Sequence, residues 1–344
     1  MNNLPILAIT MGDPAGVGPE IIAMSLAQEY PYTVCRPVVI GDAKMMELGV
    51  KSAKVELQVR PIEQVADAKY ERGVIDVLDL KLIDPATFAY GEVQAQCGHA
   101  AFEAVRTAIE LAMKGEVDGT VTAPLNKEAL HVAGHNFAGH TEIYAHYTDT
   151  KKYAMLLADD KMRVIHVSTH VSLREACDRA KKERVIAVTE LIREACLSFG
   201  IENPKIGIAG LNPHAGEGGL FGDEEIREII PAIEEMKAKG WNVDGPVPPD
   251  SLFSRARSGQ FDGCVAMYHD QGHIAFKVGG FEWDRETQRM VAVKGVNITL
   301  GLPIIRVSVD HGTAFDVAGK GIANPDALLM SIEYAALMAK NRKK

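Results

Sequence analysis

Short apolar runs that alternate with amphipathic helical patterns constrain the fold of this chain more than any other feature. Each run is short enough for a β-strand and ends in a glycine-rich or polar turn, after which a helical pattern begins. The strand-like runs lie at residues 6–10, 38–40, 74–80, 120–122, 155–157, 164–169, 206–210, 265–268 and 304–309. The helical patterns lie at residues 21–28, 43–48, 93–114, from 127 onward, 183–199, 223–239 and 326–339. Repeated strand-then-helix units predict an α/β fold in which helices cover both faces of mostly parallel sheets.

The length and composition of the chain fit a globular enzyme. With 344 residues, of which 47% are hydrophobic, the chain can form two lobes that share a cleft. Its formal net charge of −9 argues against a general nucleic-acid-binding protein, which would present a basic face. The N-terminal residues have no basic region before an apolar stretch, and no run is long enough to span a bilayer. We therefore expect a cytoplasmic enzyme with neither a nucleic-acid nor a membrane partner.

Three histidines that follow strand-like runs are candidates for a metal site. His170, His214 and His269 each lie where an apolar run gives way to a polar or glycine-rich loop. In an open α/β sheet, ligands bind outside the carboxyl ends of the strands. Three imidazoles there would leave positions on a divalent metal for water or substrate. The alternative is that each is an ordinary hydrogen-bonded residue at a strand end. The five cysteines form no CxxC pair, so neither a disulfide framework nor a thiolate metal site is indicated.

Two glycine-rich stretches are candidates for ligand-binding loops. The first, residues 12–20, follows a strand and opens a helix, so its amides could face an anion. It lacks the GxGxxG spacing and Pro14 removes one donor, so a tight strand-to-helix turn explains it equally well. The second, residues 310–325, is a long irregular loop whose small residues allow a flat ligand to approach, with His311 and Asn324 as polar edges.

Several phrases along the chain resemble the 4-hydroxythreonine-4-phosphate dehydrogenase (PdxA) family. They lie at residues 11–20, 122–127, 139–142, 211–218, 267–272, 295–303 and 309–314. The resemblance implies an isocitrate/isopropylmalate dehydrogenase-like fold, with two α/β lobes around a central cleft. It implies a discontinuous NAD-binding lobe, residues 1–122 plus 290–344, and a metal, substrate and dimerisation lobe, residues 123–289. The loop at residues 311–325 also resembles the adenosine-binding loop of isopropylmalate dehydrogenases, which favours NAD.

The resemblance also assigns roles to individual residues. The implied ligands of one divalent metal (Zn, Mg, Mn or Co) are His170, His214 and His269. The implied substrate-binding residues are His140, Thr141, Lys277, Asn297 and Arg306, and the implied cofactor-binding residues are Gly12, His311, Gly312, Thr313, Ala314 and Asn324. Lys277, Asp250 and Asp270 are candidates for the catalytic base, and the sequence does not choose among them. His166 has the same strand parity as His170, and only the family phrase at residues 168–170 favours His170.

The implied reaction is an NAD-dependent oxidative decarboxylation in a homodimer whose active site lies at the interface. The substrate would be a four-carbon 3-hydroxy acid 4-phosphate, whose 3-hydroxyl is oxidised before CO₂ leaves. Phrases at residues 126–131, 164–170 and 220–224, together with His273, look closer to the branch acting on D-threonate or D-erythronate 4-phosphate than to the vitamin B6 branch, which acts on 4-phosphohydroxy-L-threonine. An extra stretch at residues 282–294 reads as two short strands joined by a turn.

Two other classes of enzyme are compatible with the same residues. A metal-dependent hydrolase or lyase would use the three histidines without a redox cofactor. An acyl-phosphate transferase would share the fold but would not need three histidines at strand ends.

Overall fold

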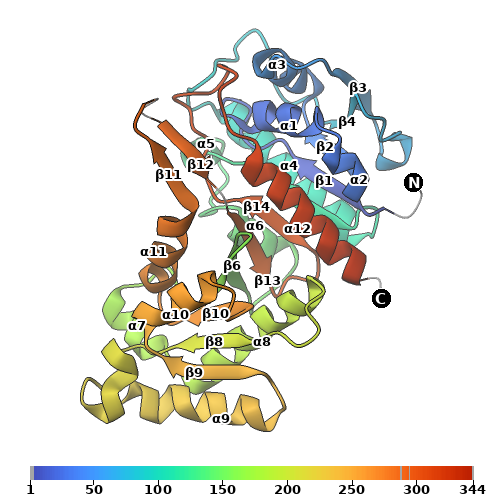
Figure 1. Ribbon diagram of the computed structural model, residues 1–344. Helices are drawn as coiled ribbons and strands as arrows, with labels where there is room; N and C mark the ends of the chain where they lie inside the picture. The colour runs from blue at the N-terminus through green and yellow to red at the C-terminus, as the bar shows by residue number, and fades with distance from the viewer. Residues whose placement is uncertain (1–3, 287–288, 294, 343–344) are drawn as a thin grey trace. The chain divides into compact units, whose positions relative to one another are not determined.

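A computed structural model describes residues 4–286, 289–293 and 295–342. The chain divides into two compact units, the first formed by Met1–Tyr153 with Leu302–Lys344 and the second by Ala154–Gly301. Both units are α/β (Figure 1), which confirms the predicted fold class. Each predicted strand overlaps an observed one, and within the described residues no helix is long and apolar enough to cross a membrane.

The first unit is built on a parallel sheet. Its strands run in the order β3-β4-β2-β1-β5-β14, and every pair is parallel. The strands are β1 (Ile6–Thr10), β2 (Arg36–Gly41), β3 (Gln58–Ile62), β4 (Val74–Asp79), β5 (Gly119–Thr122) and β14 (Arg306–Val309). The helices are α1 (Gly18–Leu26), α2 (Tyr30–Val34), α3 (Ala43–Ala53), α4 (Ala95–Met113), α5 (Lys127–Val132), α6 (His140–Tyr147) and α12 (Asp326–Arg342), with a 3₁₀ turn at Val65–Asp67. Figure 1 shows α12 in front of these strands and α4 behind them, as expected for a sheet covered on both faces.

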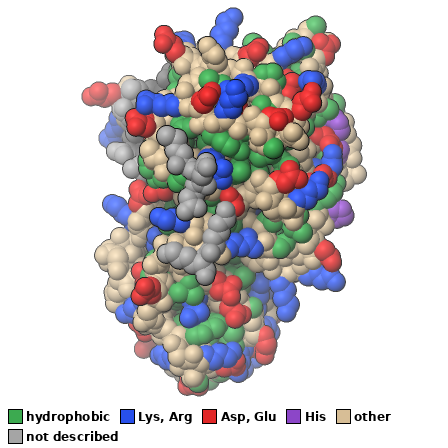
Figure 2. Space-filling model, turned by 90° about the vertical axis from the view of Figure 1, so that its right-hand side faces the viewer, with side chains coloured by type: hydrophobic (Ala, Val, Ile, Leu, Met, Phe, Trp, Pro, Cys, Tyr) green, Lys and Arg blue, Asp and Glu red, His purple; other side chains and the backbone are tan. Residues whose placement is uncertain are grey.

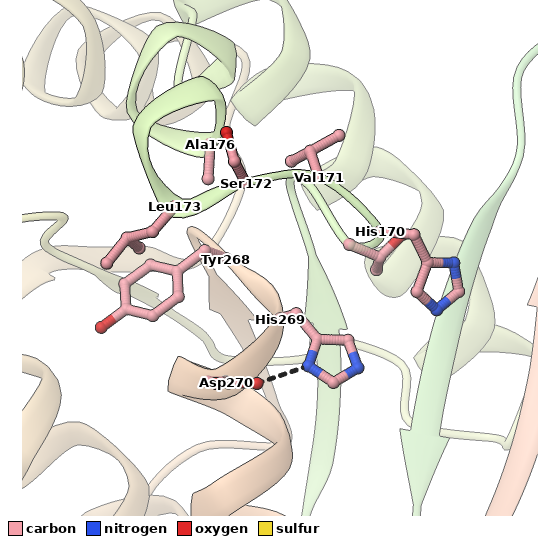
Figure 3. Close-up of a pocket in the computed structure, with 9 residues that line it drawn as sticks. His170, Val171, Ser172, Leu173, Ala176, Tyr268, His269 and Asp270 are labelled. Atoms are coloured by element: carbon pink, nitrogen blue, oxygen red, sulfur yellow. Dashed lines mark hydrogen bonds and ion pairs between the residues drawn. The ribbon is translucent and has the colours of Figure 1, made fainter.

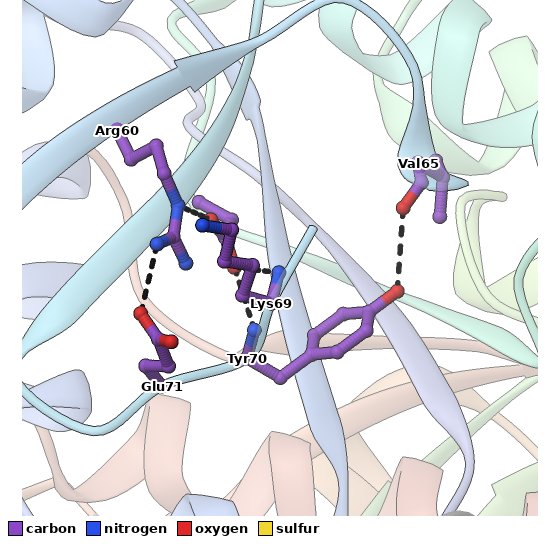
Figure 4. Close-up of polar contacts among 6 residues, drawn as sticks. Arg60, Val65, Lys69, Tyr70 and Glu71 are labelled. Carbon is purple, nitrogen blue, oxygen red and sulfur yellow. Dashed lines mark hydrogen bonds and ion pairs between the residues drawn. The ribbon is translucent and has the colours of Figure 1, made fainter. Parts of the chain in front are cut away.

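The connection between β3 and β4 is fixed by one buried carboxylate (Figure 4). Asp76 of β4 accepts hydrogen bonds from the backbone N–H groups of Lys69 and Tyr70, at 3.0 and 2.8 Å. It also accepts one from Nε of Arg60 on β3, at 2.5 Å, and Arg60 in turn contacts Glu71. The side chain of Asp76 is fully buried, so these donors replace the water that its carboxylate loses on folding.

The second unit has a mixed sheet. Its strands run in the order β13-β6-β7-β10-β8-β9; β6 is antiparallel to both β13 and β7, and the remaining pairs are parallel. The strands are β6 (Ala154–Ala158), β7 (Arg163–His166), β8 (Ile206–Ala209), β9 (Val243–Val247), β10 (Gly263–Ala266) and β13 (Val296–Leu300). The helices are α7 (Leu173–Arg179), α8 (Lys182–Ser198), α9 (Ile230–Ala238), α10 (Pro249–Arg257) and α11 (His269–Gly280); η2 (Pro213–Gly219) and η3 (Glu225–Ile229) are a 3₁₀ and a π segment.

A two-stranded hairpin follows α11, as the extra stretch predicted. Its strands, β11 (Phe281–Asp284) and β12 (Arg289–Val293), are antiparallel. Residues 287, 288 and 294 of that stretch lie outside the described residues.

The two compact units divide at 153/154 and 301/302, whereas the functional lobes expected from the resemblance, with boundaries at 122/123 and 289/290, stay a prediction. On one side, Leu130 of α5 and Ile143 and Tyr144 of α6 pack in one cluster with α4, so this segment belongs to the first unit. On the other side, β13 pairs along its whole length with β6, so residues 290–301 belong to the second unit. The split therefore follows side-chain packing and strand pairing, which the family phrases did not indicate.

Charged side chains of both signs are interspersed over the face shown in Figure 2, where no patch of a single sign dominates.

Candidate active site

Four histidines gather where β7 and β10 end in the second unit. The two strands are parallel and pair Ala266 with His166, so their carboxyl ends lie side by side. The following loops stay joined, because Ser168 Oγ donates to the carbonyl oxygen of Met267, at 3.2 Å. One strand leads to His166 and then His170, and the other leads to α11, which begins at His269. The ring centroids of His170 and His269 are 5.8 Å apart.

A pocket of about 460 Å³ opens beside these loops. Its lining comes from two segments, Thr169–Leu173 with Ala176, and Tyr268–Asp270. Figure 3 shows the His170 and His269 rings on one side of the pocket and Leu173 with Tyr268 on the other. The pocket therefore has a polar imidazole side and an apolar side, as small-molecule sites commonly do.

The hydrogen bonds of two imidazoles fix which nitrogen carries the proton when the ring is neutral. Nδ1 of His269 lies 2.7 Å from Oδ1 of Asp270, and Nδ1 of His273 lies 3.1 Å from the carbonyl oxygen of His269. A carboxylate and a carbonyl can only accept, so both Nδ1 atoms donate and both Nε2 atoms keep a lone pair. A carboxylate that orients a histidine through Nδ1 is the usual second partner of a metal-binding imidazole. Nε2 of His269 thus keeps a lone pair that could serve a metal ion or a hydrogen-bond donor.

His166 and His273 lie deeper than His269. The rings of His269 and His273 stack, with their centroids 3.7 Å apart and an interplanar angle of 10°. The ring centroid of His166 lies 4.6 Å from that of His273. Burial lowers the pKa of His166 to about 3, helped by repulsion from His273 and His269. Burial likewise lowers the pKa of His273 to about 4, with repulsion from His269, Lys277 and His170. Both imidazoles are therefore neutral at physiological pH.

His214 does not join this group within one chain. It lies in η2 with a left-handed backbone, φ 54°, and its Nδ1 faces Oε2 of Glu217 at 3.3 Å. Its side chain is 68% exposed. Across the described part of the chain, no three His, Cys, Asp or Glu side chains come close enough to hold a metal ion. The structure therefore brings together two of the three predicted ligands, His170 and His269, and leaves the third apart.

Two residues that the sequence did not single out hold the loop after β8. Glu225 accepts from the backbone N–H groups of Leu211 and Asn212, at 2.7 and 2.8 Å. Gln271 accepts from the N–H of Met267 and donates to the carbonyl oxygen of Gly210, at 2.7 and 2.9 Å. Gln271 therefore ties the loop that carries His214 to the start of α11. The sequence contained one signal that could have identified Gln271: it lies between Asp270 and Gly272 in the family phrase at residues 267–272.

The other candidate residues of the second unit lie on three different elements. Lys277 lies on α11, eight residues after His269, and contributes to the electrostatic environment of His273. Asn297 lies on β13, where its Nδ2 is 2.6 Å from Sδ of Met155. Asp250 is exposed in the first turn of α10. Asp270 is 70% exposed and is engaged with His269.

The first unit carries the remaining substrate candidates. Arg306 at the start of β14 is buried and donates from Nη2 to Oγ1 of Thr122, at 3.1 Å. Its guanidinium lies over the ring of Tyr144 on α6, 5.6 Å from the centroid. Burial lowers the pKa of Arg306 to about 10, which leaves it charged. His140 and Thr141 form the first turn of α6, and burial together with the charge of Arg306 lowers the pKa of His140.

Three loops meet at the carboxyl ends of β1, β5 and β14. The backbone N–H of Asp13 donates to the carbonyl oxygen of Pro124, at 2.8 Å. The backbone N–H of Val17 donates to the carbonyl oxygen of Thr313, at 3.0 Å. Gly12 has φ +72°, and a Cβ there would lie 2.3 Å from the carbonyl oxygen of Pro124. Glycine at position 12 is thus required for loop packing, whether or not a cofactor lies against it.

The loop at residues 310–325 is anchored by a residue from α1. Each carboxylate oxygen of Glu20 accepts one backbone N–H, from Gly319 and from Ala323, both at 3.1 Å. The predicted cofactor residues Gly312, Thr313 and Ala314 lie in this loop, Ala314 with φ 45°. His311 directs Nδ1 to the carbonyl oxygen of Gly312, at 2.9 Å, and Asn324 accepts the N–H of Asp326, at 2.7 Å. Asn324 therefore also helps to begin α12.

Comparison with known proteins identifies the family. Residues 33–335 match the family described as pyridoxal phosphate biosynthetic protein PdxA. The chain is 48% identical to the D-threonate 4-phosphate dehydrogenase of Pectobacterium atrosepticum, over 97% of this chain and 99% of that one. It is 43% identical to the 4-hydroxythreonine-4-phosphate dehydrogenase of Desulforapulum autotrophicum, over 98% and 96% of the two chains. A crystal structure of 4-hydroxythreonine-4-phosphate dehydrogenase from Klebsiella pneumoniae matches with a TM-score of 0.84 and 45% identity, over 98% and 99% of the two chains. The chain therefore belongs to the PdxA family of enzymes.

Proposed function

We propose that this enzyme is an NAD-dependent and divalent-metal-dependent dehydrogenase acting on D-threonate 4-phosphate or D-erythronate 4-phosphate. The secondary alcohol at C3 is oxidised: the hydride on C3 passes to NAD, the hydroxyl proton passes to a base, and the resulting β-keto acid loses CO₂. The observation that carries the proposal is the pairing of His170 with an Asp270-oriented His269. It occurs in a chain 48% identical to a D-threonate 4-phosphate dehydrogenase.

Two nitrogen donors of the second unit suit a divalent metal, and a third would have to come from outside this pair, because no three described His, Cys, Asp or Glu side chains come together within one chain. Nε2 of His269 carries a lone pair, and His170 lies close enough to supply a second nitrogen. When bound, such an ion supplies Lewis-acid chemistry at the 3-hydroxyl and at the carbonyl that replaces it. Imidazole ligands suit zinc and other late transition metals, so Zn²⁺ and Co²⁺ are the first ions to test, followed by Mn²⁺ and Mg²⁺.

Three residues of the first unit suit the phosphate of the substrate. The planar guanidinium of Arg306 can donate two parallel hydrogen bonds to phosphate oxygens, which a lysine could not reproduce. The charge of Arg306 acts on His140, whose buried Nε2 has no hydrogen-bond partner within the described residues. Thr141 adds a hydroxyl in the same helical turn. Asn297 of the second unit remains a candidate for hydrogen bonding to polar groups of the substrate.

Lys277 is the base that the arrangement favours. Asp270 is committed to His269, so it orients a ligand rather than accepting the proton of the substrate. His269, His273 and Lys277 follow one another at intervals of four residues on α11, which places them along one side of the helix. Asp250 lies on α10 instead. Lys277 is therefore the proposed catalytic base, on the same side of α11 as the imidazoles. Asp250 is the alternative candidate for the base.

The cofactor would lie against the loop at residues 310–325 in the first unit. Small residues at Gly312, Thr313 and Ala314 allow close approach of a flat ring, and the Glu20 contacts hold this loop in one conformation. The buried Nε2 of His311 has no hydrogen-bond partner in the described part of the chain, so it offers a polar contact to the bound nucleotide.

We further propose that the active unit is a homodimer in which His214 of one chain completes the site of the other. The elements that carry the histidines also expose large apolar side chains, namely Leu173, Leu220, Phe221, Ile226, Ile274 and Val278. A second copy covering this surface would bury it, and exposed apolar area of this kind marks interaction sites. The five free cysteines are compatible with a cytoplasmic location, which we also propose.

The test is NADH formation, followed by absorbance, with D-threonate 4-phosphate and each divalent metal in turn. We expect activity that EDTA abolishes and metal restores. Phosphate or CO₂ release without NADH would indicate a hydrolase or lyase, and acyl transfer from acetyl phosphate to coenzyme A would indicate a transferase. For the dimer, mixing inactive His170→Ala with inactive His214→Ala should restore part of the activity. A fully active monomer in sedimentation would overturn that part of the proposal.

A further inference from the structure

The turn that carries His214 has a left-handed backbone. From His214 to Gly218, five successive residues take positive φ values, 54°, 54°, 81°, 44° and 65°. His214, Ala215 and Glu217 are not glycine, and they are three of the eight non-glycine residues with positive φ in the described part of the chain. A left-handed backbone brings Cβ close to the following carbonyl oxygen, so each of these residues raises the free energy of the folded state. Such a conformation persists only where the surrounding structure fixes it, and it is found most often at functional sites.

One buried carboxylate fixes this left-handed turn. Glu225 is 1% exposed, and its Oε1 accepts the N–H groups of Leu211 and Asn212, at 2.7 and 2.8 Å. Its Oε2 accepts a third hydrogen bond, from Nδ2 of Asn212, at 2.9 Å. The turn packs on the same oxygen, because a Cβ added to Gly216 would lie 2.8 Å from Oε2. The carboxylate therefore holds the residues before the turn and supports the turn itself.

The helix that supplies Glu225 is also irregular. Residues Glu225–Ile229 form the π segment η3, which continues directly into α9. π segments are rare, and inside α-helices they occur frequently at functional sites. The side chain of Glu225 thus joins two uncommon backbone conformations, the left-handed turn and η3. This indicates that the contact secures the position of the turn rather than stability alone.

We propose that Glu225 is a positioning residue that keeps residues 214–218 left-handed and so presents His214 outward. In this conformation the side chain of His214 is 68% exposed, and its Nδ1 lies 3.3 Å from Oε2 of Glu217. Because Nδ1 faces a carboxylate of its own turn, Nε2 is the nitrogen that remains for a metal ion held by a second copy. The role of His214 as a ligand rests on the proposed function, whereas the hold of Glu225 on the turn does not.

Hydrogen exchange followed by mass spectrometry, on metal-free protein, tests the hold on the turn. Glu225→Gln keeps the shape of the side chain, but in either orientation its NH₂ faces a donor, from the backbone or from Nδ2 of Asn212. We expect amides of residues 210–222 to exchange faster by about tenfold or more. Glu224→Gln is the matched control, because Glu224 accepts from the same Nδ2, at 2.7 Å, at a less buried position. Its exchange should change by less than about threefold, and unchanged exchange in Glu225→Gln would overturn the inference.

A double-mutant cycle tests whether the strain of the turn depends on Glu225. Glycine adopts positive φ without steric cost, so Ala215→Gly should raise the melting temperature of the unmodified enzyme by about 1–3 °C. In the Glu225→Gln background the turn can relax, so the same substitution should give a clearly smaller rise. Lys54→Gly, at the left-handed C-cap of α3 (φ 55°), is the control and should give equal rises in both backgrounds. An undiminished rise from Ala215→Gly beside Glu225→Gln would contradict a hold on the turn by Glu225.

Titration with Co²⁺ tests the consequence for His214. We expect Glu225→Gln to weaken Co²⁺ binding by about tenfold or more and to give the absorption spectrum of His214→Ala, since both changes would remove one imidazole from the ion. Unmodified affinity and spectrum in a folded Glu225→Gln variant would overturn the positioning role. If His214→Ala itself leaves affinity and spectrum unchanged, the proposed function fails at this ligand, and the exchange and melting data still decide whether Glu225 holds the turn.

Discussion

His99 and His135 share a hydrogen bond of 3.0 Å between Nδ1 of the first ring and Nε2 of the second. The bond joins α4 to the segment that precedes α6. His135 also stacks on Phe102, with centroids 3.8 Å apart. Since α6 begins at His140, these ring contacts fix the approach to the candidate phosphate-binding turn.

We predict that the contact between His99 and His135 lowers the stability of the folded enzyme at acidic pH. Burial and repulsion from His99 lower the pKa of His135 in the folded state. Between that lowered pKa and the unfolded value of about 6.5, the unfolded chain binds more protons, so stability rises with pH and is lost as pH falls. Urea unfolding at pH 7.5 and 5.5 measures the loss. His135→Gln keeps a hydrogen-bonding group but cannot be protonated, so the loss should become smaller. Equal losses of stability for His135→Gln and the unmodified enzyme would contradict the prediction. His131→Gln, at an exposed position, is the control and should lose as much stability as the unmodified enzyme.

Asp13 should give the opposite pH dependence. Burial raises its pKa to about 6, although one oxygen accepts the backbone N–H of Ala15 at 2.9 Å. The folded state therefore binds the extra proton between the unfolded value of 3.8 and about 6, and stability is lost as pH rises through this window. Asp13→Asn keeps the acceptor without the charge. We expect the Asp13→Asn variant to be more stable than the unmodified enzyme by about 2 kcal/mol at pH 8 and equally stable near pH 4, as measured by urea unfolding. A gain of the same size at both pH values would argue against a buried charge as its cause.

Removing the carboxylate of Asp76 should destabilise the first unit. Asp76→Ala leaves two backbone N–H groups and the Nε of Arg60 without their acceptor. We expect a loss of about 2–4 kcal/mol in the free energy of unfolding. Glu71→Gln changes the exposed partner of the same arginine and should cost less than about 0.5 kcal/mol. Chemical denaturation of both variants tests the difference, and similar small effects would show that the buried carboxylate is dispensable.

Asp270→Asn tests the orientation of the proposed metal ligand. The amide can place its oxygen near Nδ1 of His269 but lacks the charge that makes the ring a stronger ligand. We expect metal affinity to fall by about 10–100-fold, measured by titration with Co²⁺ and followed by its absorption spectrum. Asp223→Asn, whose carboxylate pairs with Arg227 on the surface, should leave affinity unchanged. Unaltered affinity in Asp270→Asn would remove the orienting role.

Arg306→Lys should impair the proposed phosphate site. Lysine keeps the charge but cannot donate two parallel hydrogen bonds, and it loses the contact with the Tyr144 ring. We expect kcat/KM to fall on the order of 100-fold, mainly through KM, in steady-state assays. Arg342→Lys near the end of α12 is the control. A change in kcat alone would indicate that Arg306 acts on the reaction rather than on phosphate binding.

The sequence predicted most of the buried strands, and it missed β13 as well as two strands at the sheet edges, β3 and β9. β3 and β9 are the outermost strands of their units, and each contains a proline and polar residues, Pro61 with Arg60 in one and Pro246 with Asp244 in the other. Edge strands need not be apolar, so hydrophobic runs do not reveal them.

The candidate site was predictable only in part, for the same kind of reason. That His170 and His269 lie together follows from the parallel pairing of β7 with β10, which no local pattern encodes. The separation of His214 depends on the left-handed turns of η2, where several non-glycine residues take positive φ. The stack of His166 under His273 could not be inferred, because strand parity left His166 and His170 equivalent.

The two hydrogen bonds from Glu20 to Gly319 and Ala323 link residues 299 and 303 positions apart. During synthesis, the carboxylate of Glu20 emerges long before the segment it must hold, and β14 can join β5 only when almost the whole chain has left the ribosome. The loop that would hold the nucleotide is thus among the last parts to take shape. An incomplete chain cannot form it, so premature termination products would neither sequester nucleotide nor compete with the finished enzyme for it.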